Sequence, residues 1–329
     1  MRVAVVGAGS MGGKHAQILA GLPDVDEVLV VDAVASRAAA VAADVSGRPM
    51  EHDAALDAAD AAVVATPAHF HATSVDAAMA RGIPVLCEKP LTESVASSTS
   101  LVERVERLGA HVEVGFQRRH DPSFVAARER LAGSGPIHLL RLTAFDPLVE
   151  AAEFAPNEAA PLFLHSSVHD FDFARWMSDS EVIEVTADGS GRSDPRPPDV
   201  RSLVTAVVSM RMASGALAVL EATWLHPAGY DSRVEVVAER AHVIAGLSPR
   251  TPAEHLDWPT DGSTPPWAGY LERYEAAYRA ELVAFLAAAR GERTPASTAR
   301  DGLEALRIAV AATRSYEERR TVSLSEIGA

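Results

Sequence analysis

Residues 3–13, Val-Ala-Val-Val-Gly-Ala-Gly-Ser-Met-Gly-Gly, decide the fold of the first half of the chain. The four apolar residues predict a buried strand, the glycines predict a tight turn, and residues 13–22 predict a helix. Gly7 would permit the turn, Gly9 would let the backbone approach a pyrophosphate, and Gly12 would let the helix pack closely against the strand. Because a helix N-terminus attracts anions, the pattern predicts a dinucleotide site; a glycine-rich turn without a ligand is the alternative.

A second apolar run, residues 28–31, ends at Asp32, about twenty residues after Gly12. A carboxylate at this spacing can accept hydrogen bonds from the ribose hydroxyls of the adenosine half of the cofactor. Its charge would repel a 2'-phosphate, so we expect NAD in preference to NADP. NADP would fit only if Asp32 turned away and Ser36 and Arg37 held the phosphate; otherwise Arg37 would stack on the adenine or face solvent.

Strands and helices continue to alternate as far as residue 114, which predicts an α/β domain with a doubly wound parallel sheet, a Rossmann fold. The expected helices cover residues 36–44, 53–58, 69–81 and 94–108, and the expected further strands cover residues 61–65, 83–87 and 111–114. Because parallel strands place ligands at their carboxyl ends, the loops after these strands should border the cofactor.

The strand at residues 83–87 stops at Glu88-Lys89-Pro90. Pro90 would restrict the backbone of Lys89 and so direct its ammonium group, and the Lys89-Pro90 bond could be cis. An ordinary surface lysine is the alternative. In the loop after the strand at 61–65, Thr66 could touch the nicotinamide ribose or serve only as a helix cap. The expected cofactor contacts are Gly7, Gly9, Ser10, Met11, Gly12, Asp32, Arg37, Thr66, Pro67, His71, Glu88 and Lys89.

From residue 136 onward, strand-like runs follow one another without intervening helices, which predicts an α+β domain built on an open, mostly antiparallel sheet. The expected strands cover residues 137–145, 181–188, 202–212, 216–223, 232–238 and 242–246, and the expected final helices cover residues 271–290 and 299–319. A loop rich in Pro, Gly and Thr separates the two groups at residues 248–266. We therefore predict two domains, residues 1–120 and 121–329.

A helix predicted over residues 164–176 carries His165, His169 and Asp172, whose spacing of four and three residues places them on one helical face. The histidine pair lacks an evident third ligand, so no metal site is expected. A polar face satisfied by solvent is the alternative to a catalytic role.

Composition limits the partners of the protein. The 329 residues carry a formal net charge of -15, and no basic block offers a phosphate-binding surface, which argues against nucleic acid and anionic membranes. The single cysteine, Cys87, excludes an internal disulfide and fits a small apolar residue in a buried strand. No apolar run approaches ~20 residues, so we expect no membrane span and a soluble, cytoplasmic protein.

The ordered motifs GAGSMGGKHA (7–16), VVDA (30–33), ATPAHFHA (65–72), CEKPL (87–91) and GFQRRHDPSF (115–124) resemble the glucose-fructose oxidoreductase, inositol dehydrogenase and rhizopine-catabolism (Gfo/Idh/MocA) family. The resemblance covers nearly the whole chain. It implies an oxidoreductase that transfers hydride between NAD(P) and a secondary alcohol of a cyclic polyol or sugar. It also implies a C-terminal sheet whose outer face pairs subunits, and hence a homodimer or homotetramer.

The resemblance further implies the site residues. Lys89 and His169 would be catalytic, and Lys89, Gln117, Arg118, His165, His169 and Tyr230 would bind substrate. Arg118 could instead pair locally with Asp121. Members of the family usually carry an aspartate where this chain has His165, so His169 would depend on Asp172, on water or on the substrate for support.

In the proposed chemistry, His169 takes the hydroxyl proton and Lys89 stabilises the developing alkoxide, although Lys89 could instead be the base. A glycosidase that retains its nucleotide and a non-catalytic dinucleotide-binding sensor are the alternative functions. The scarcity of aromatic residues favours a polyol or sugar over an apolar alcohol.

Overall fold

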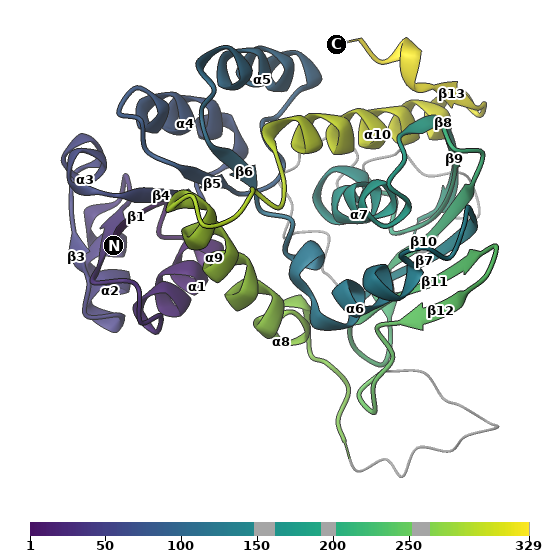
Figure 1. Ribbon diagram of the computed structural model, residues 1–329, viewed down its shortest axis with the longest axis horizontal. Helices are drawn as coiled ribbons and strands as arrows, with labels where there is room; N and C mark the ends of the chain where they lie inside the picture. Colours follow the sequence, from purple (N-terminus) through teal and green to yellow (C-terminus); the bar gives the residue numbers. More distant parts are fainter. Residues whose placement is uncertain (148–161, 192–201, 252–263, 329) are drawn as a thin grey trace. The chain divides into compact units, whose positions relative to one another are not determined.

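The computed structural model describes residues 1–147, 162–191, 202–251 and 264–328. The chain divides into two compact units, one formed by residues 1–117 with 277–306 and the other by residues 118–276 with 307–328. Figure 1 labels their helices and strands. The two units are described separately below, and the division into domains 1–120 and 121–329 remains a prediction.

The first unit is built on a six-stranded parallel sheet with the order β3-β2-β1-β4-β5-β6. Its strands are β1 (Arg2–Val6), β2 (Glu27–Val31), β3 (Arg48–Pro49), β4 (Ala61–Val64), β5 (Val85–Cys87) and β6 (Val112–Val114). The central strand β1 pairs with β2 on one side and β4 on the other, so the strand order reverses there. This order confirms the predicted Rossmann fold. Only the short β3 was not predicted.

Helices cover both faces of this sheet, with α1 and α2 on one face and α3 and α4 on the other (Figure 1). The helical segments are α1 (Ser10–Ala20), α2 (Ala35–Asp44), α3 (His52–Ala58), η1 (Ala68–Phe70), α4 (His71–Met79), α5 (Val95–Leu108), α9 (Glu275–Ala289) and the beginning of α10 (Ala299–Glu318). A short turn, η2 (Gln117–His120), follows β6.

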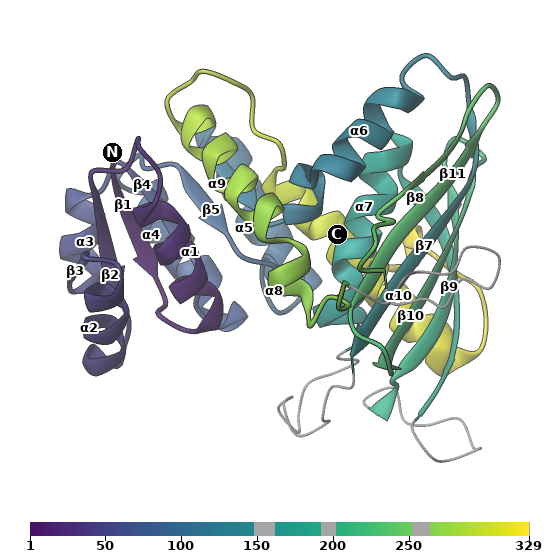
Figure 2. The ribbon, with the colours of Figure 1, turned by 90° about the horizontal axis from the view of Figure 1, so that it is seen from below.

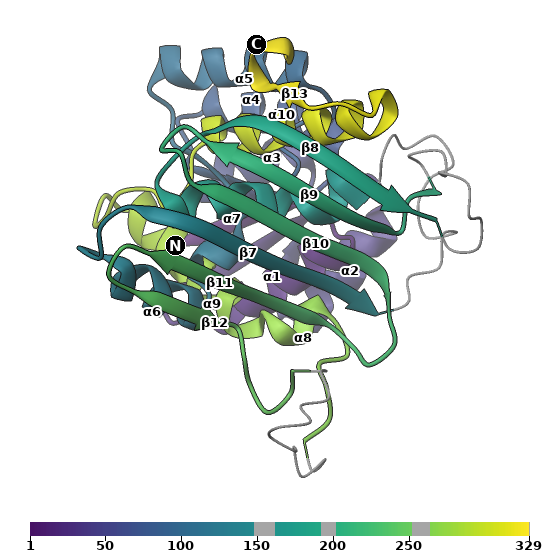
Figure 3. The ribbon, with the colours of Figure 1, turned by 90° about the vertical axis from the view of Figure 1, so that its right-hand side faces the viewer.

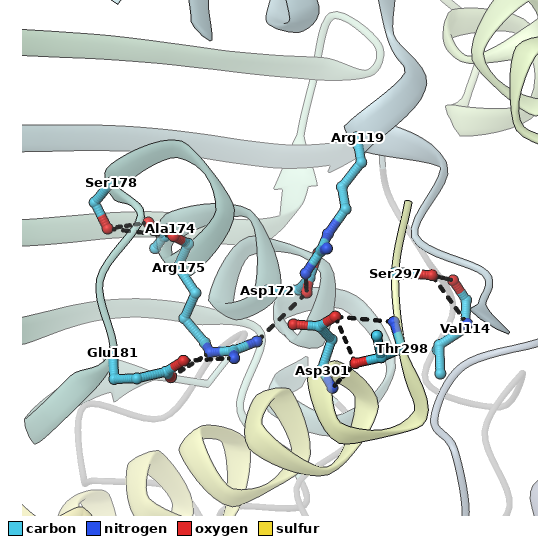
Figure 4. A network of polar contacts seen from close by, with 10 residues as sticks. All are labelled: Val114, Arg119, Asp172, Ala174, Arg175, Ser178, Glu181, Ser297, Thr298 and Asp301. Atoms are coloured by element: carbon cyan, nitrogen blue, oxygen red, sulfur yellow. Dashed lines mark hydrogen bonds and ion pairs between the residues drawn. The ribbon is translucent and has the colours of Figure 1, made fainter. Parts of the chain in front are cut away.

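The late segment at residues 277–306 completes the first unit. Ser297 Oγ donates to the carbonyl of Val114 (2.7 Å) and accepts from its backbone N–H (3.0 Å), as Figure 4 shows. A Cβ on Gly302 would lie 2.9 Å from Val114 Cγ2 and 3.0 Å from Leu91 Cβ. The packing of this segment against β6 is therefore close enough to require glycine at position 302.

The second unit is built on a seven-stranded sheet with the order β12-β11-β7-β10-β9-β8-β13. Its strands are β7 (Ile137–Pro147), β8 (Val182–Ser190), β9 (Thr205–Met212), β10 (Leu217–His226), β11 (Asp231–Ala238), β12 (His242–Ala245) and β13 (Val322–Ser323). Strands β7 and β10 pair in parallel, and the other described pairs are antiparallel. The open, mostly antiparallel sheet is therefore confirmed, with β13 as an addition.

Alternate residues of these strands face a helical layer on one side of the sheet. In β9, for example, Ala206, Val208, Met210 and Met212 are buried, whereas Val207, Ser209 and Arg211 are exposed. Helices α6 (Pro122–Leu131) and α7 (Val168–Ser178) lie against the buried face (Figure 2), and Figure 3 views the sheet from its uncovered face. The unit also contains η4 (Leu162–Ser167), α8 (Tyr270–Arg273), the end of α10 and η6 (Leu324–Glu326).

The main differences from the predicted helices concern three segments. Helix α6 was not predicted, although Asp121 and Pro122 form a strong helix start: Asp121 Oδ1 accepts from the N–H groups of Ser123 (3.0 Å) and Phe124 (3.3 Å). The helix predicted at 164–176 begins as the wider π-helical turn η4, and the helix predicted at 271–290 is divided at Tyr274. Most of the loop predicted at 248–266 lies outside the described residues.

Within the described ranges, no helix is both long enough and apolar enough to span a bilayer.

Candidate active site

The glycine turn after β1 has the geometry that its sequence predicts. Gly7 has a φ of +103°, and a Cβ there would lie 2.6 Å from the carbonyl oxygen of Ala65. A Cβ on Gly12 would lie 1.7 Å from the carbonyl oxygen of Gly7, so the helix can approach the turn only without a side chain. A Cβ on Gly9 would meet no atom within 4 Å. Gly9 therefore leaves open space beside the N-terminus of α1, which begins at Ser10 and includes Met11 in its first turn.

Asp32 lies at the carboxyl end of β2 and is tied to the same turn. Its Oδ2 accepts from the N–H of Ala8 (2.8 Å), and its Oδ1 accepts from the N–H of Val34 (2.9 Å). Arg37 Nη1 lies 3.4 Å from Oδ1. Burial opposes the charge, but these hydrogen bonds and Arg37 together lower the pKa of Asp32. The carboxylate is therefore ionised and fixed, and its remaining lone pairs are available to hydroxyl donors.

The loop after β4 borders the same edge of the sheet. His71 is buried; its Nε2 lies 2.7 Å from the carbonyl oxygen of Thr66, and its Nδ1 lies 2.9 Å from that of Pro90. His71 thereby joins this loop to the loop after β5. Thr66 Oγ1 is buried without a hydrogen-bond partner among the described residues, whereas Pro67 is exposed. Direct contact of Thr66, Pro67 and His71 with a cofactor remains a prediction.

Lys89 follows β5, whose three residues are all buried. Glu88 is also buried: its Oε1 lies 2.8 Å from His15 Nε2, and its Oε2 accepts from the N–H of Lys89 at 3.2 Å. The Lys89-Pro90 peptide bond is cis. The side chain of Lys89 is partly exposed, at the same edge of the sheet as the glycine turn.

These residues fit NAD. The edge presents a helix N-terminus, open space at Gly9 for a pyrophosphate, and the fixed anion of Asp32 at the ribose end. A bound nicotinamide would supply the hydride acceptor, and the chain's own residues would orient it. The structure thus brings the predicted first-unit residues together at one edge of one sheet.

In the second unit, His165 lies in η4 and His169 in the first turn of α7, and both are partly exposed. The hydroxyl of Ser166 accepts from Trp224 Nε1 (2.9 Å), which fixes η4 against β10. Asp172 differs from the two histidines because its side chain is buried. Its Oδ2 accepts from Arg119 Nε (2.9 Å) and its Oδ1 from Arg119 Nη2 (2.5 Å), as Figure 4 shows.

Arg175 extends this network. Its Nη1 lies 3.8 Å from Asp172 Oδ1, and its Nε and Nη2 donate to the carboxylate of Glu181 at 2.6 and 2.8 Å (Figure 4). Two arginines therefore hold Asp172, which gives this residue a structural task in α7. The predicted support of His169 by Asp172 remains a prediction.

Arg118 and Tyr230 meet in a second buried cluster. Arg118 Nη1 donates to Asp170 Oδ1, and Arg118 Nη2 lies 3.5 Å from the hydroxyl of Tyr230. The arginine carbon Cζ lies 5.7 Å from the ring centre of Tyr274. Burial disfavours the charged guanidinium, but the nearby Asp170 keeps the pKa of Arg118 well above its ordinary value. Burial also raises the pKa values of Asp170 and Tyr230.

The structure does not show the alternative ion pair between Arg118 and Asp121. Asp121 Oδ2 instead accepts from Arg273 Nη1 at 2.6 Å. Gln117, at the end of the first unit, is buried, and its Oε1 has no hydrogen-bond partner among the described residues. Sequence reasoning missed Asp170, because its buried pair with Arg118 joins positions 52 residues apart and leaves no local signal.

Comparisons with known proteins agree with this geometry. The profile of an oxidoreductase family with an NAD-binding Rossmann fold (GFO_IDH_MocA) matches residues 1–116, and that of the family's C-terminal alpha/beta domain matches residues 128–324. The chain is 36% identical to the myo-inositol dehydrogenase Hyg17 of Streptomyces leeuwenhoekii, covering 96% of this chain and 97% of the relative. It is 31% identical to the myo-inositol 2-dehydrogenase of Thermotoga maritima, covering 99% of each chain.

A solved structure is similar over the same length. The crystal structure of a putative myo-inositol dehydrogenase from Sinorhizobium meliloti superposes with a TM-score of 0.87 at 31% identity, covering 98% of this chain and 99% of that chain.

Proposed function

Because the chain belongs to the Gfo/Idh/MocA oxidoreductase family, whose NAD-binding Rossmann domain and C-terminal domain it carries, we propose that it oxidises an inositol. The reaction transfers hydride from a secondary alcohol of this cyclic polyol to NAD. Relatives that match over almost the whole chain are named as inositol dehydrogenases, which supports this substrate class. The observation that carries the proposal is the position of Lys89 at the sheet edge that holds the glycine turn and Asp32.

In this proposal Lys89 and His169 are the catalytic residues. The ammonium group of Lys89 donates a hydrogen bond to the reacting oxygen and stabilises its alkoxide character. His169 accepts the hydroxyl proton, a task suited to imidazole because its ordinary pKa lies close to neutral pH. Gln117, Arg118, His165 and Tyr230 bind the remaining hydroxyl groups.

Asp32 supports NAD over NADP as the working cofactor. Its carboxylate is ionised and held by two backbone N–H groups, so it cannot turn away from a 2'-phosphate without breaking both bonds. For Ser36 and Arg37 to bind the 2'-phosphate of NADP, Asp32 would have to give up both of these hydrogen bonds.

The proposal is tested by following the absorbance of reduced nicotinamide with a panel of inositols, aldoses and sugar acids. We expect NAD-dependent turnover with myo-inositol or scyllo-inositol. Lys89→Ala and His169→Ala should each lower kcat by about 100- to 10,000-fold, the usual contribution of a positioned acid or base.

Matched controls separate chemistry from general damage. Lys14 is the only other lysine of the chain, and His138 is an exposed histidine of β7. Lys14→Ala and His138→Ala should keep near wild-type kcat. Near wild-type turnover of both Lys89→Ala and His169→Ala would refute the catalytic assignment, and absence of any net reduction of NAD with the whole panel would refute the dehydrogenase.

We further propose that the protein works in the cytoplasm as a homodimer or homotetramer. The single cysteine supports a reducing compartment. The uncovered sheet face of the second unit supports self-association, because it exposes Ile183, Val207, Leu217 and Ile244 at 41–52%.

A further inference from the structure

Glu281 is an unusual buried acid in the first unit. It lies in α9, is 2% exposed, and neither of its carboxylate oxygens has a hydrogen-bond partner among the described residues. An ionised carboxylate that is buried without a partner is far less favourable than the neutral acid. The position of Glu281 therefore favours the protonated form.

Two further buried carboxylates act electrostatically on Glu281, and both have partners. Glu88 Oε1 lies 2.8 Å from His15 Nε2. Glu113 Oε1 lies 2.9 Å from His111 Nε2, and Glu113 Oε2 accepts from the N–H of Ala296 at 3.0 Å. Burial, followed by the charges of Glu88 and Glu113, raises the pKa of Glu281 well above its ordinary value.

Glu88 connects this group to Lys89. Burial favours the neutral acid, but the hydrogen bond and charge of His15 and the charge and backbone N–H of Lys89 outweigh it and lower the pKa of Glu88. Since the ionised carboxylate can only accept, His15 Nε2 donates to it. Glu88 is also confined, because a Cβ on Gly115 would lie 3.3 Å from its carboxyl group.

We propose that Glu281 is a carboxylic acid that keeps its proton at neutral pH and that, when it ionises, acts on Lys89 through the buried carboxylate of Glu88. While Glu281 is neutral, Glu88 remains ionised, bonded to His15 and to the backbone of Lys89. When Glu281 ionises at alkaline pH, a further negative charge joins those of the buried carboxylates. That charge strengthens the hold on the Lys89 ammonium and destabilises the folded unit.

The titratable groups that take part come from four parts of the first unit. They are His15 in α1, Glu88 and Lys89 directly after β5, His111 directly before β6 with Glu113 in β6, and Glu281 in α9. The role of Lys89 in catalysis rests on the function proposed above. The proton on Glu281 does not, so the two can be tested apart.

The first experiment tests whether the folded protein keeps the Glu281 proton, by measuring how its stability depends on pH. Above the ordinary glutamate pKa of 4.5, the unfolded chain loses the Glu281 proton and the folded chain keeps it. The stability of the wild-type protein should therefore fall, relative to Glu281→Gln, as the pH rises from about 5 toward the folded pKa of Glu281. Denaturant unfolding should show the ratio of wild-type to variant unfolding constants rising by up to about tenfold per pH unit.

The control is Glu103→Gln, which neutralises an exposed glutamate of α5 in the same unit. The ratio of its unfolding constant to that of the wild type should stay the same from pH 5 to 9. A pH-independent ratio for Glu281→Gln as well would overturn the proposal. Should the Gln variant not fold, infrared spectroscopy of the wild-type protein decides: the carbonyl band of a protonated carboxylic acid must persist at pH 7, and its absence overturns the proposal.

The second experiment measures the link to Lys89. The chain has only two lysines, Lys14 and Lys89, so reductive methylation with carbon-13 gives resolvable methyl signals, and Lys14→Arg assigns them. We expect Lys89 to titrate at lower pH in Glu281→Gln than in the wild type, and Lys14 to be unchanged. Identical Lys89 titrations would overturn the coupling of Glu281 to Lys89, whether or not inositol proves to be the substrate.

Discussion

At the scale of single residues, the same substitution should affect stability at one glycine of the turn and cofactor binding at another. In Gly12→Ala the new Cβ would lie 1.7 Å from a backbone carbonyl oxygen, so the turn or the helix must move. We expect a loss of about 3 kcal/mol or more in the free energy of unfolding, the upper end for overpacked sites, measured by urea denaturation.

Gly9→Ala is the matched control for stability and the test for cofactor binding. Its Cβ meets no atom within 4 Å, so the free energy of unfolding should change by less than about 1 kcal/mol. The methyl group would occupy the space assigned to the pyrophosphate, so NADH binding, followed by fluorescence titration, should weaken at least tenfold. Unchanged NADH affinity would show that the cofactor does not pass over Gly9.

Asp32→Ala should weaken NAD binding and reduce the discrimination against NADP. The loss of charge-assisted hydrogen bonds is worth about 1.5–3 kcal/mol, or roughly 10- to 150-fold in kcat/KM for NAD. Asp44→Ala, at an exposed position of α2, is the control.

Because the pKa of Asp32 is lowered, its stabilising bonds to Ala8 and Val34 should persist at neutral pH and fade only as the pH falls below the ordinary aspartate range.

Residue roles that depend on spacing along the chain could be predicted, and roles that depend on tertiary packing could not. Gly7, Gly9, Gly12 and Asp32 act within a local strand-turn-helix-strand unit, so their geometry is written in adjacent sequence. Glu281 carries no such signal. Its burial depends on a helix that packs against residues far earlier in the chain, such as His15 and His111.

At the scale of elements, Asp121 anchors α6 through two separable contacts. Its Oδ1 caps the helix, and its Oδ2 pairs with Arg273. Asp121→Asn keeps a good cap but leaves the largely buried Arg273 unpaired, which should cost about 3 kcal/mol. Asp121→Ala also removes the cap and should cost about 1 kcal/mol more. Equal unfolding free energies of the two variants, measured by urea denaturation, would show that the cap contributes nothing.

The strands of the second unit were predicted nearly to their ends because half-buried strands alternate between apolar and polar residues. The capping signal at Asp121-Pro122 was equally local, yet α6 was missed because its apolar residues do not form a clear stripe. The change of pitch at η4 has no sequence signal. It depends on contacts such as that between Ser166 and Trp224, which join distant segments.

At the scale of the whole molecule, the proposed oligomer can be tested on the uncovered sheet face. Val207 lies in β9 and is 49% exposed. If two copies pair through this face about a two-fold axis, Val207→Glu introduces two charges per interface. Sedimentation velocity should show a shift to a smaller species, the monomer if the wild type is a dimer and the dimer if it is a tetramer.

Leu108→Glu, at the exposed end of α5, is the control and should leave the mass unchanged. A mass unchanged by Val207→Glu would exclude this part of the sheet from the interface. Loss of assembly in Leu108→Glu alone would place the interface elsewhere.

The contribution of residues 277–306 to the first unit has a consequence for synthesis. The ribosome makes β1 to β6 first, yet Ala296 and Ser297, which bind Glu113 and Val114, emerge only after residues 118–276. At about 5–20 residues per second, the nascent sheet waits roughly 8 to 30 s for them. During that delay we expect Glu113, which later accepts a hydrogen bond from Ala296, to be solvated by water instead.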